Sequence, residues 1–369
     1  MVNRRAPCEP LMRRPLAGLT IADFYGPDTH LPLRLAGALA GRVAADLGAR
    51  VLRFEPAGGD PLRKMPPFIA GTGISLAFLN AGKETILCEH VEPERMFGGA
   101  DALITDASVS MGAGAPPITA ILSLFKPGAE HGPASEFTLM ALGGLLDMVG
   151  DPEREPLKLA GHQAAYAAGL AAFTGIAAAL CRAPVDGRFP SQTIEVSLLD
   201  TVIWLNWKSV PSADASGSSP TRMGAAAEWQ VLRCADGFAA LVYQENDWAQ
   251  LKALIGDPRL DAACFADRAG RLLRGRELAE IIEARFLRLT RRELHGLAFA
   301  HRLPIGPVWS PQELLADEQN LSRDFLKSVE VEGGDSIAMP RLPVIWGGKT
   351  FAPGPIAKTR AETAPVADS

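Results

Sequence analysis

Short apolar runs alternate with stretches of helical periodicity through the first third of the chain. The apolar runs have the length and composition of buried strands and occur at residues 19–24, 49–55, 85–89, 100–105 and 120–125. Between the first two runs, apolar residues recur at helical spacing from Leu33 to Leu47, and Gly48 follows where helices commonly end on glycine. This alternation predicts a parallel β-sheet with covering helices.

The pattern changes in the second half of the chain. Helical periodicity is found at residues 137–149 and 163–181, and a strand predicted at 193–196 leads into a helix at 197–210. The segment PSADASGSSPT (residues 211–221) is rich in Ser, Pro and Gly and is predicted to be a linker.

Beyond this linker, a strand is predicted at residues 237–243 and a helix at 248–255. Two capping boxes, Thr290 with Glu293 and Ser310 with Glu313, mark the starts of two more helices. A smaller α+β domain is therefore predicted. The Ala-, Pro- and Thr-rich segment after Phe351 is expected to fray.

The segment LAGHQAAYAAGLAAFTGIAAAL (residues 159–180) contains no Asp, Glu, Lys or Arg and is long enough for a transmembrane span. Spans depend on strongly apolar side chains, whereas this segment is mostly Ala and Gly, with His162, Gln163 and Tyr166 near its start. We therefore interpret it as a buried helix of a soluble protein, whose small side chains allow another backbone or a ligand to approach closely.

The composition argues against a nucleic-acid-binding surface, a disulfide framework and a secretory signal. The chain has 369 residues, 47% of them hydrophobic and 21% charged, as in ordinary globular proteins of one or two domains. Its formal net charge of −5 argues against a nucleic-acid-binding surface. Five cysteines without a C-x-x-C pair indicate reduced thiols. The basic N-terminus lacks an apolar core typical of a secretory signal, so a cytoplasmic location is expected.

Several common chemistries lack their motifs. The chain has no H-E-x-x-H, G-x-S-x-G or Walker A sequence, and Gly71-Thr72-Gly73 lacks the third glycine of a dinucleotide fingerprint. The six histidines are dispersed. Neither a metal site nor a nicotinamide or flavin cofactor is predicted.

A series of longer motifs occurs in a characteristic order. They are LAGALAGRVAADLGARVLRFEPAGGDPLR (35–63), LNAGKETILCE (79–89), HGPASEFTLMALGGLLDMVGDP (131–152), SQTIEVSLLD (191–200), CADG (234–237) and LPIGPVWSPQELLADEQNLSR (303–323). In this order, from about residue 16 to 343, the chain resembles the family III CoA transferases. That group includes formyl-CoA transferase, carnitine CoA-transferase and α-methylacyl-CoA racemase.

The resemblance implies an α/β fold with a large Rossmann-like domain and a smaller α+β domain, in which two subunits interlock as a dimer. Together with the linker, it predicts five segments. These are a disordered basic arm (1–15), the large domain (16–210), the linker (211–222), the small domain (223–330) and a C-terminal return to the large domain with its tail (331–369).

The resemblance also implies a chemistry that this chain lacks. Family transferases use an aspartate that attacks the thioester carbonyl and forms a mixed anhydride. Alignment of residues 156–170 puts that aspartate at Ala165, and a methyl group cannot attack a thioester. The racemase branch pairs the same aspartate with a histidine, whose position falls near Ser135, beside Glu136.

Two neighbours are the candidate acid/base groups. His162 and Tyr166 are four residues apart, so they share a helix face and could serve an acyl-CoA substrate. The alternative is that they only close the start of the helix by hydrogen bonds. Glu136 as a stand-in base has the alternative of ordinary acidic placement at a helix start.

Coenzyme A is the ligand that the resemblance implies, as substrate or bound group. The polar residues at matching positions that suit its phosphates are Arg53, Arg63, Asn80, Lys83 and, in addition, Lys126. Each has the alternative of being a solvated surface residue. The segment at residues 105–117 lacks the Asn-Phe-x-Pro-Gly loop with which many family members bind the CoA diphosphate.

Three functional classes remain open. The leading hypothesis is a CoA-transferase-like protein handling acyl-CoA thioesters, as one subunit of a heteromeric transferase whose partner supplies the aspartate. The second is an enzyme of the same fold with changed chemistry, such as an isomerase, lyase or hydratase. The third is a non-catalytic CoA-binding scaffold. The expected partners are a second copy or a related subunit, and an acyl-CoA or carboxylic acid; no nucleic acid or membrane is expected.

Overall fold

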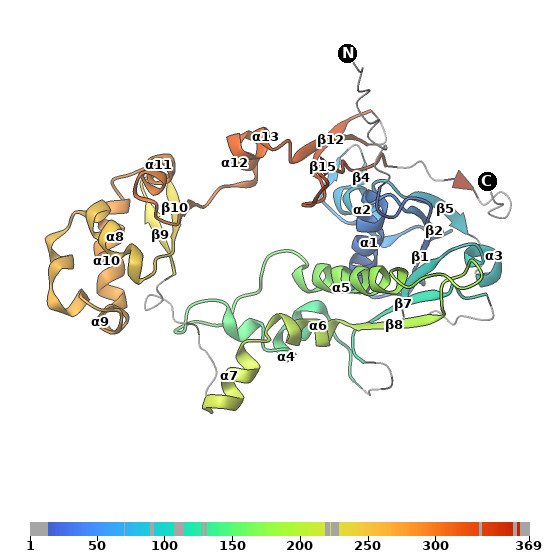
Figure 1. Ribbon diagram of the computed structural model, residues 1–369, viewed down its shortest axis with the longest axis horizontal. Coiled ribbons are helices and arrows are strands. Elements are labelled where there is room, and N and C mark those ends of the chain that lie inside the picture. The colour runs from blue at the N-terminus through green and yellow to red at the C-terminus, as the bar shows by residue number, and fades with distance from the viewer. Residues whose placement is uncertain are drawn as a thin grey trace, which may run out of the picture. The chain divides into compact units, whose positions relative to one another are not determined.

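The computed structural model describes residues 14–69, 71–88, 92–106, 114–126, 128, 131–217, 222, 229–331, 334–356 and 360–361. The arm predicted at residues 1–15 therefore lies almost wholly outside the described residues. The chain forms two compact units (Figure 1). The large unit comprises Met1–Leu146, Lys158–Ala215 and Gln319–Ser369, and the small unit comprises Asp147–Leu157 and Ser216–Glu318.

A seven-stranded parallel sheet forms the centre of the large unit, in the order β16-β5-β2-β1-β6-β7-β8. Its strands are β1 (Thr20–Phe24), β2 (Arg50–Pro56), β5 (Glu84–Cys88), β6 (Ala102–Asp106), β7 (Ile118–Ser123), β8 (Gln192–Ser197) and β16 (Arg360–Ala361). The strands β2, β6 and β7 are almost continuously buried, as expected for a parallel sheet covered on both faces. The predicted parallel sheet is confirmed.

Seven helices belong to the described part of the large unit before residue 217. They are α1 (Leu31–Asp46), α2 (Ile74–Asn80), α3 (Pro93–Phe97), α4 (Glu136–Leu142), α5 (Gln163–Leu180), α6 (Leu198–Leu205) and α7 (Ser209–Ser216). Three short antiparallel pairings complete the described strands of this unit, each a two-stranded sheet. They are β3 (Phe68–Ile69) with β4 (Thr72–Gly73), β12 (Leu326–Glu330) with β13 (Ser336–Pro340), and β14 (Ile345–Trp346) with β15 (Lys349–Thr350).

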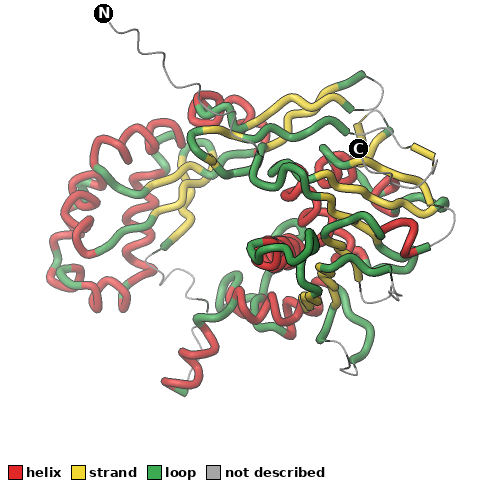
Figure 2. The backbone as a smooth tube through the Cα atoms, turned by 45° about the vertical axis from the view of Figure 1, so that its right-hand side comes forward, coloured by secondary structure: helices red, strands yellow, loops and turns green. Residues whose placement is uncertain are grey.

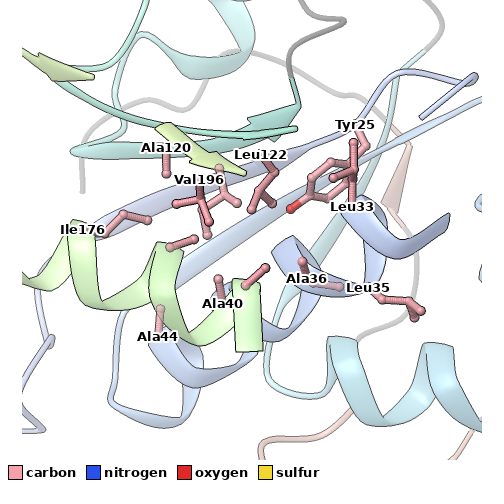
Figure 3. Close-up of a cluster of buried hydrophobic side chains, with 14 of the residues drawn as sticks. Tyr25, Leu33, Leu35, Ala36, Ala40, Ala44, Ala120, Leu122, Ile176 and Val196 are labelled. Atoms are coloured by element: carbon pink, nitrogen blue, oxygen red, sulfur yellow. The ribbon is translucent and has the colours of Figure 1, made fainter. Parts of the chain in front are cut away.

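Helices cover the two faces of the large sheet. Helices α1 and α5 pack on one face, where Ala36 and Ala40 of α1 and Ile176 of α5 lie in one core cluster with Ala120 and Leu122 of β7 (Figure 3). The other face buries Phe24 and Phe54 against Phe97 of α3. Successive side chains of a strand point to opposite faces, so each strand contributes to both layers of the core.

Helix α5 packs so closely on α1 that a side chain would not fit at the contact. A Cβ atom at Gly169 would lie 2.3 Å from the backbone oxygen of Ala36. By length and composition α5 could cross a membrane, but Ala165, Ala168 and Ile176 are buried in the core of the large unit. The predicted buried, closely packed helix is confirmed.

The small unit has a three-stranded antiparallel sheet, in the order β11-β10-β9. Its elements are β9 (Gln230–Cys234), β10 (Gly237–Leu241), α8 (Trp248–Ile255), α9 (Arg268–Leu273), α10 (Gly275–Phe286), α11 (Arg291–His301), β11 (Ile305–Pro307) and α12 (Pro311–Ala316); α13 (Glu318–Ser322) follows at its boundary. The helices gather on one side of the sheet (Figure 2), and the side chains of Leu232 and Ala239 are buried while those of Val231 and Phe238 are exposed. Both predicted capping boxes are present.

Three local predictions differ from the structure. The helix expected at 137–149 ends at Leu142, because Gly143 and the left-handed Gly144 (φ +74°) follow it. The predicted linker is helical through Ser216, and Pro211 is tolerated because it lies in the first turn of α7, where no intrahelical N–H bond is needed. Within the tail expected to fray after Phe351, residues 360–361 form strand β16 of the sheet, and residues 357–359 and 362–369 lie outside the described residues.

Candidate functional site

The carboxyl edge of the parallel sheet is where this topology places a ligand. The strand order reverses between β1 and β6, with β2 and β5 on one side and β7 and β8 on the other. Open α/β sheets bind ligands at such a switch point, outside the carboxyl ends of the strands. Helix α1 follows β1, and α5 lies in the crossover from β7 to β8, so both helices begin at this edge.

Glu136 is a buried acid that contacts the start of α5. Ser135 caps helix α4, and Glu136 opens that helix with only 5% of its surface exposed. Its Oε1 accepts the backbone N–H groups of Ala164 and Ala165 at 3.0 and 3.2 Å, while its Oε2 lies 2.6 Å from Nδ1 of His162. The carboxylate therefore satisfies the first turn of α5, where unpaired N–H groups and the helix dipole favour a negative charge.

Ala165 occupies the first turn of α5, and its methyl group is fully buried in the core of the large unit. Its N–H group is already bonded to Glu136, as is that of Ala164. These two N–H groups are therefore not free to stabilise an oxyanion while Glu136 keeps this position. The side chain at this position offers neither a nucleophile nor a base.

His162 and Tyr166 lie together, as their spacing predicts. Both side chains are half-buried, and their ring centroids are 6.4 Å apart in an edge-on arrangement. Burial and the charge of Glu136 raise the pKa of the Tyr166 phenol above its usual value, so Tyr166 is a neutral hydrogen-bond donor at pH 7. Their catalytic role stays a prediction. Among the described residues, no group of three or more His, Cys, Asp and Glu side chains is placed to hold a metal ion.

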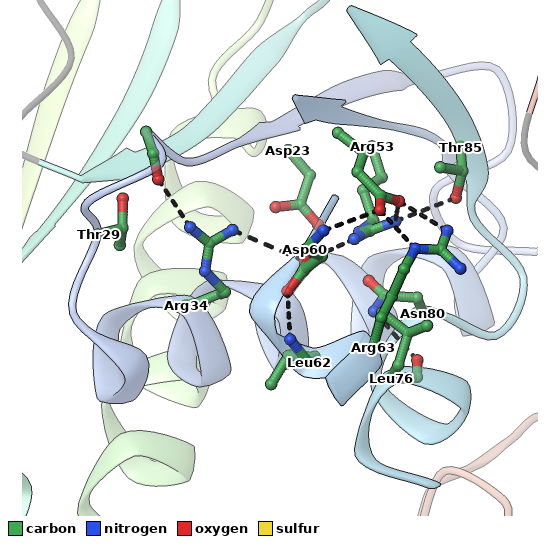
Figure 4. A network of polar contacts seen from close by, with 12 residues as sticks. Asp23, Thr29, Arg34, Arg53, Asp60, Leu62, Arg63, Leu76, Asn80 and Thr85 are labelled. Carbon is green, nitrogen blue, oxygen red and sulfur yellow. Dashed lines mark hydrogen bonds and ion pairs between the residues drawn. The ribbon is translucent and has the colours of Figure 1, made fainter. Parts of the chain in front are cut away.

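A second polar group, which we call the arginine cluster, lies at the carboxyl end of β2 (Figure 4). It comprises Arg34, Arg53, Glu55, Asp60 and Arg63. Arg53 lies 2.8 Å from Glu55 and 2.5 Å from Asp60, and Nη2 of Arg63 donates to Glu55 at 2.8 Å. Three guanidinium groups thus face two carboxylates.

The arginines of the cluster strongly favour the ionised form of Glu55. Burial opposes the ionisation of its carboxyl group, but the hydrogen bond from Arg63 and the charge of Arg53 outweigh this effect and lower its pKa to about 2. The carboxylate is only 1% exposed. The ionised Glu55 therefore holds both arginines at the sheet edge.

Three of the predicted CoA-binding residues are buried, and the other two are accessible to solvent. Lys83 is fully buried and donates to Asp23 at 2.5 Å and to the backbone oxygen of Ala38 at 2.8 Å. Asn80 is buried and donates to the backbone oxygen of Leu76, and Arg53 is buried in the arginine cluster. The Arg63 side chain is 37% exposed and Lys126 is exposed. This geometry favours Arg63 and Lys126 for direct phosphate contact, and the assignment stays a prediction.

Two features were not predicted from the sequence: the burial of Arg34 in the arginine cluster and the contacts of Glu136 with the start of α5. Arg34 is 2% exposed, donates to the backbone oxygen of Gly26 at 2.7 Å and reaches Asp60 at 3.7 Å. The available signal was its place among the apolar residues of α1. Residues 107–113 of the shortened loop at 105–117 lie outside the described residues.

Known proteins resemble this chain over most of its length. The model of the family "CoA-transferase family III" matches residues 16–112 and 125–356. The succinate–glutarate CoA-transferase of Agrobacterium fabrum is 27% identical over 370 residues, covering 91% of this chain and 90% of that protein. The succinyl-CoA:(R)-benzylsuccinate CoA-transferase subunit BbsE of Thauera aromatica is 25% identical and covers 84% of this chain and 85% of its own.

Solved structures agree in fold. A CaiB/BaiF family protein from Brucella suis has a TM-score of 0.79 at 23% identity, with 94% of this chain and 96% of that chain covered. A crystal structure of Rv3272 from Mycobacterium tuberculosis has a TM-score of 0.73 at 23% identity, with 93% and 97% covered. The order of motifs, the parallel sheet and the family match lead to one assignment: the chain belongs to CoA-transferase family III.

Proposed function

We propose that this chain binds an acyl-CoA thioester at the carboxyl edge of its parallel sheet and acts as one subunit of a heteromeric CoA transferase. A related partner subunit supplies the aspartate that captures the acyl group. The proposal goes beyond family membership in two respects: the division of labour between subunits, and the site that binds CoA.

The main supporting observation is the fully buried methyl group of Ala165 in the first turn of α5. Helix α5, its close contact with α1 and the buried Glu136 surround the position at which family alignment puts the aspartate. Covalent acyl capture needs a nucleophilic side chain there. Because this chain provides none, a transferase built from it needs the nucleophile of another subunit.

The arginine cluster and Lys126 support binding of the CoA phosphates. Charge-assisted hydrogen bonds from arginine suit phosphate oxygens, and the cluster lies at the edge where the sheet topology places a ligand. Arg63 combines exposure with a fixed orientation, since Glu55 holds its Nε and Nη2.

Two observations support a partner. The relative BbsE is named as a subunit of a CoA-transferase, so heteromeric assembly occurs among proteins similar to this chain. In addition, the large unit exposes a set of large apolar side chains on α4, α6 and the turn after α6, which we call the tryptophan face: Phe137, Leu142, Ile203, Trp204, Leu205 and Trp207. Exposed apolar surface of this kind marks protein–protein contact.

The substitution Ala165→Asp tests the assignment of the site. We expect this variant, incubated with succinyl-CoA, to form a covalent acyl adduct that mass spectrometry detects and hydroxylamine removes, because the substitution restores the nucleophile. The parent chain should form no such adduct. Ala165→Asn is the matched control, since its side chain has the same size without a nucleophilic carboxylate.

CoA binding and CoA transfer by the parent chain test the rest of the proposal. Calorimetric titration with CoA should show binding to the parent chain, and Arg63→Ala should weaken it. A parent chain that by itself transfers CoA from succinyl-CoA to a dicarboxylate at ordinary enzymatic rates would contradict the proposal. Absence of both CoA binding and an Ala165→Asp adduct would remove acyl-CoA as the ligand.

A further inference from the structure

The transferase function proposed above does not use the contact between Glu136 and His162. Glu136 comes from the start of α4 and His162 from the residue that precedes α5, so the fold brings together two groups that are 26 residues apart. Helix capping explains only one oxygen of Glu136. Oε1 takes the N–H groups of Ala164 and Ala165, whereas Oε2 is directed at the imidazole.

Glu136 determines which nitrogen of His162 carries the proton. A carboxylate only accepts hydrogen bonds, so the proton in the 2.6 Å contact belongs to Nδ1. In the neutral ring, Nε2 then carries the lone pair and is the basic nitrogen. Within the ranges that the structure describes, Nε2 has no hydrogen-bond partner, and 26% of the His162 side chain is exposed. The imidazole is thus an oriented base with access to solvent.

Ala165 determines which nucleophile such a base serves. It lies in the helical turn that His162 begins, and its methyl group offers no oxygen for activation. A base at this site therefore acts on a nucleophile that diffuses in, and water is always present. Tyr166 lies on the same helix face as His162 and is a neutral donor suited to a carbonyl oxygen.

We propose that the Glu136–His162 pair gives this chain an activity of its own, the hydrolysis of acyl-CoA thioesters; this inference rests on the acyl-CoA binding proposed above. Nε2 of His162 takes a proton from a water molecule, and the water oxygen forms a bond to the thioester carbonyl carbon. The tetrahedral intermediate collapses, the C–S bond breaks, and the imidazolium returns the proton to the CoA thiolate. The products are a carboxylic acid and CoA.

Glu136 is a positioning residue in this reaction, because it acts through His162. The substitution Glu136→Gln separates this role from helix capping. The amide oxygen can still accept the N–H groups of Ala164 and Ala165, but the amide nitrogen donates to Nδ1 and forces the proton onto Nε2. The variant therefore keeps the helix cap and loses the base.

The experiment uses the full chain with acetyl-CoA and succinyl-CoA as probes. We expect thiol release by the parent chain, with one oxygen-18 atom from labelled water in the product acid. Glu136→Gln should lower kcat by roughly 100-fold or more, the usual contribution of a general base. His162→Phe should give a similar loss, and the double variant no further loss. The melting temperature and the affinity for CoA should stay near those of the parent.

His295→Gln is the matched control, since His295 lies in α11 of the small unit, with its ring against Phe299. It should hydrolyse at the parent rate. If the parent chain and Glu136→Gln hydrolyse acyl-CoA at the same rate, Glu136 only caps the helix. This result would overturn the inference. CoA binding without thiol release above the buffer rate would also overturn it and leave the transferase proposal intact. If Glu136→Gln does not fold, His162→Phe decides, because its ring is partly exposed.

Discussion

Charged residues in the large unit are placed by partners that are distant along the chain. Lys83 is buried beside Asp23, which is 60 residues earlier, and Glu136 reaches the start of α5. An unpaired buried charge is costly, so burial of these groups depends on the partners that the fold supplies. The sequence shows the residue types but not this pairing. It therefore suggested phosphate-binding lysine and arginine residues where the structure has internal ion pairs.

At the residue scale, the contribution of Glu55 to the free energy of unfolding should depend on pH. Its folded-state pKa of about 2 lies below its ordinary value of 4.5, so its stabilising contribution is present above pH 4.5 and is lost as pH falls toward 2. Glu55→Gln should lower the free energy of unfolding at pH 7 by on the order of 3 kcal/mol. The difference from the parent protein should shrink between pH 4.5 and pH 2, as measured by urea denaturation.

Glu84→Gln is the control for this measurement. Glu84 and Arg50 form an ion pair whose side chains are 41% and 47% exposed, and such surface pairs contribute about 1 kcal/mol or less. A Glu55→Gln difference that stays constant from pH 7 to pH 2 would show that the arginine cluster does not hold this carboxylate ionised.

At the scale of elements, small residues determine how α5 lies in the large unit. Its Ala and Gly positions allow the helix to touch the backbone of α1 while it covers the sheet. The sequence indicated this close packing, because a helix of small side chains has no other way to bury its surface well. It did not identify the contacting element, since residue spacing gives the face of a helix but not what packs on it.

Gly169→Ala tests this contact. The new Cβ would lie 2.3 Å from the Ala36 oxygen, so one of the two helices must shift. We expect the free energy of unfolding to fall by about 1–3 kcal/mol, as for other overpacked cores. Gly296→Ala is the matched control in α11, where a Cβ meets no atom within 4 Å. That substitution should be neutral or stabilise the protein by about 1 kcal/mol. Similar midpoints for both variants in urea denaturation would contradict the close contact.

At the scale of the whole molecule, the tryptophan face is the surface that suits a protein partner. The side chain of Trp204 is 72% exposed and that of Trp207 is 63% exposed, an arrangement that is unfavourable for an isolated chain in water. The sequence-based expectation of an interlocked dimer stays a prediction. The tryptophan face supports association of the large unit with a protein partner.

The double variant Trp204→Glu and Trp207→Glu tests this surface. Charged side chains in an apolar interface are costly, so we expect the assembled protein to dissociate, as measured by sedimentation velocity. The helix content by circular dichroism should not change, because both side chains are exposed. Leu273→Glu is the control, since this residue is 88% exposed in α9 of the small unit. An unchanged sedimentation coefficient for the double variant would exclude the tryptophan face from the interface.

The sequence by itself determined the parallel sheet, most helices, the family resemblance and the alanine at the nucleophile position. These features depend on local periodicity, turn residues and the order of motifs, all of which are readable along the chain. The tertiary structure alone decided that Glu136 caps α5 and holds His162, and that Lys83 pairs internally with Asp23. Such contacts join residues on separate elements, and burial makes their pairing necessary, so they are visible only once the elements are packed together.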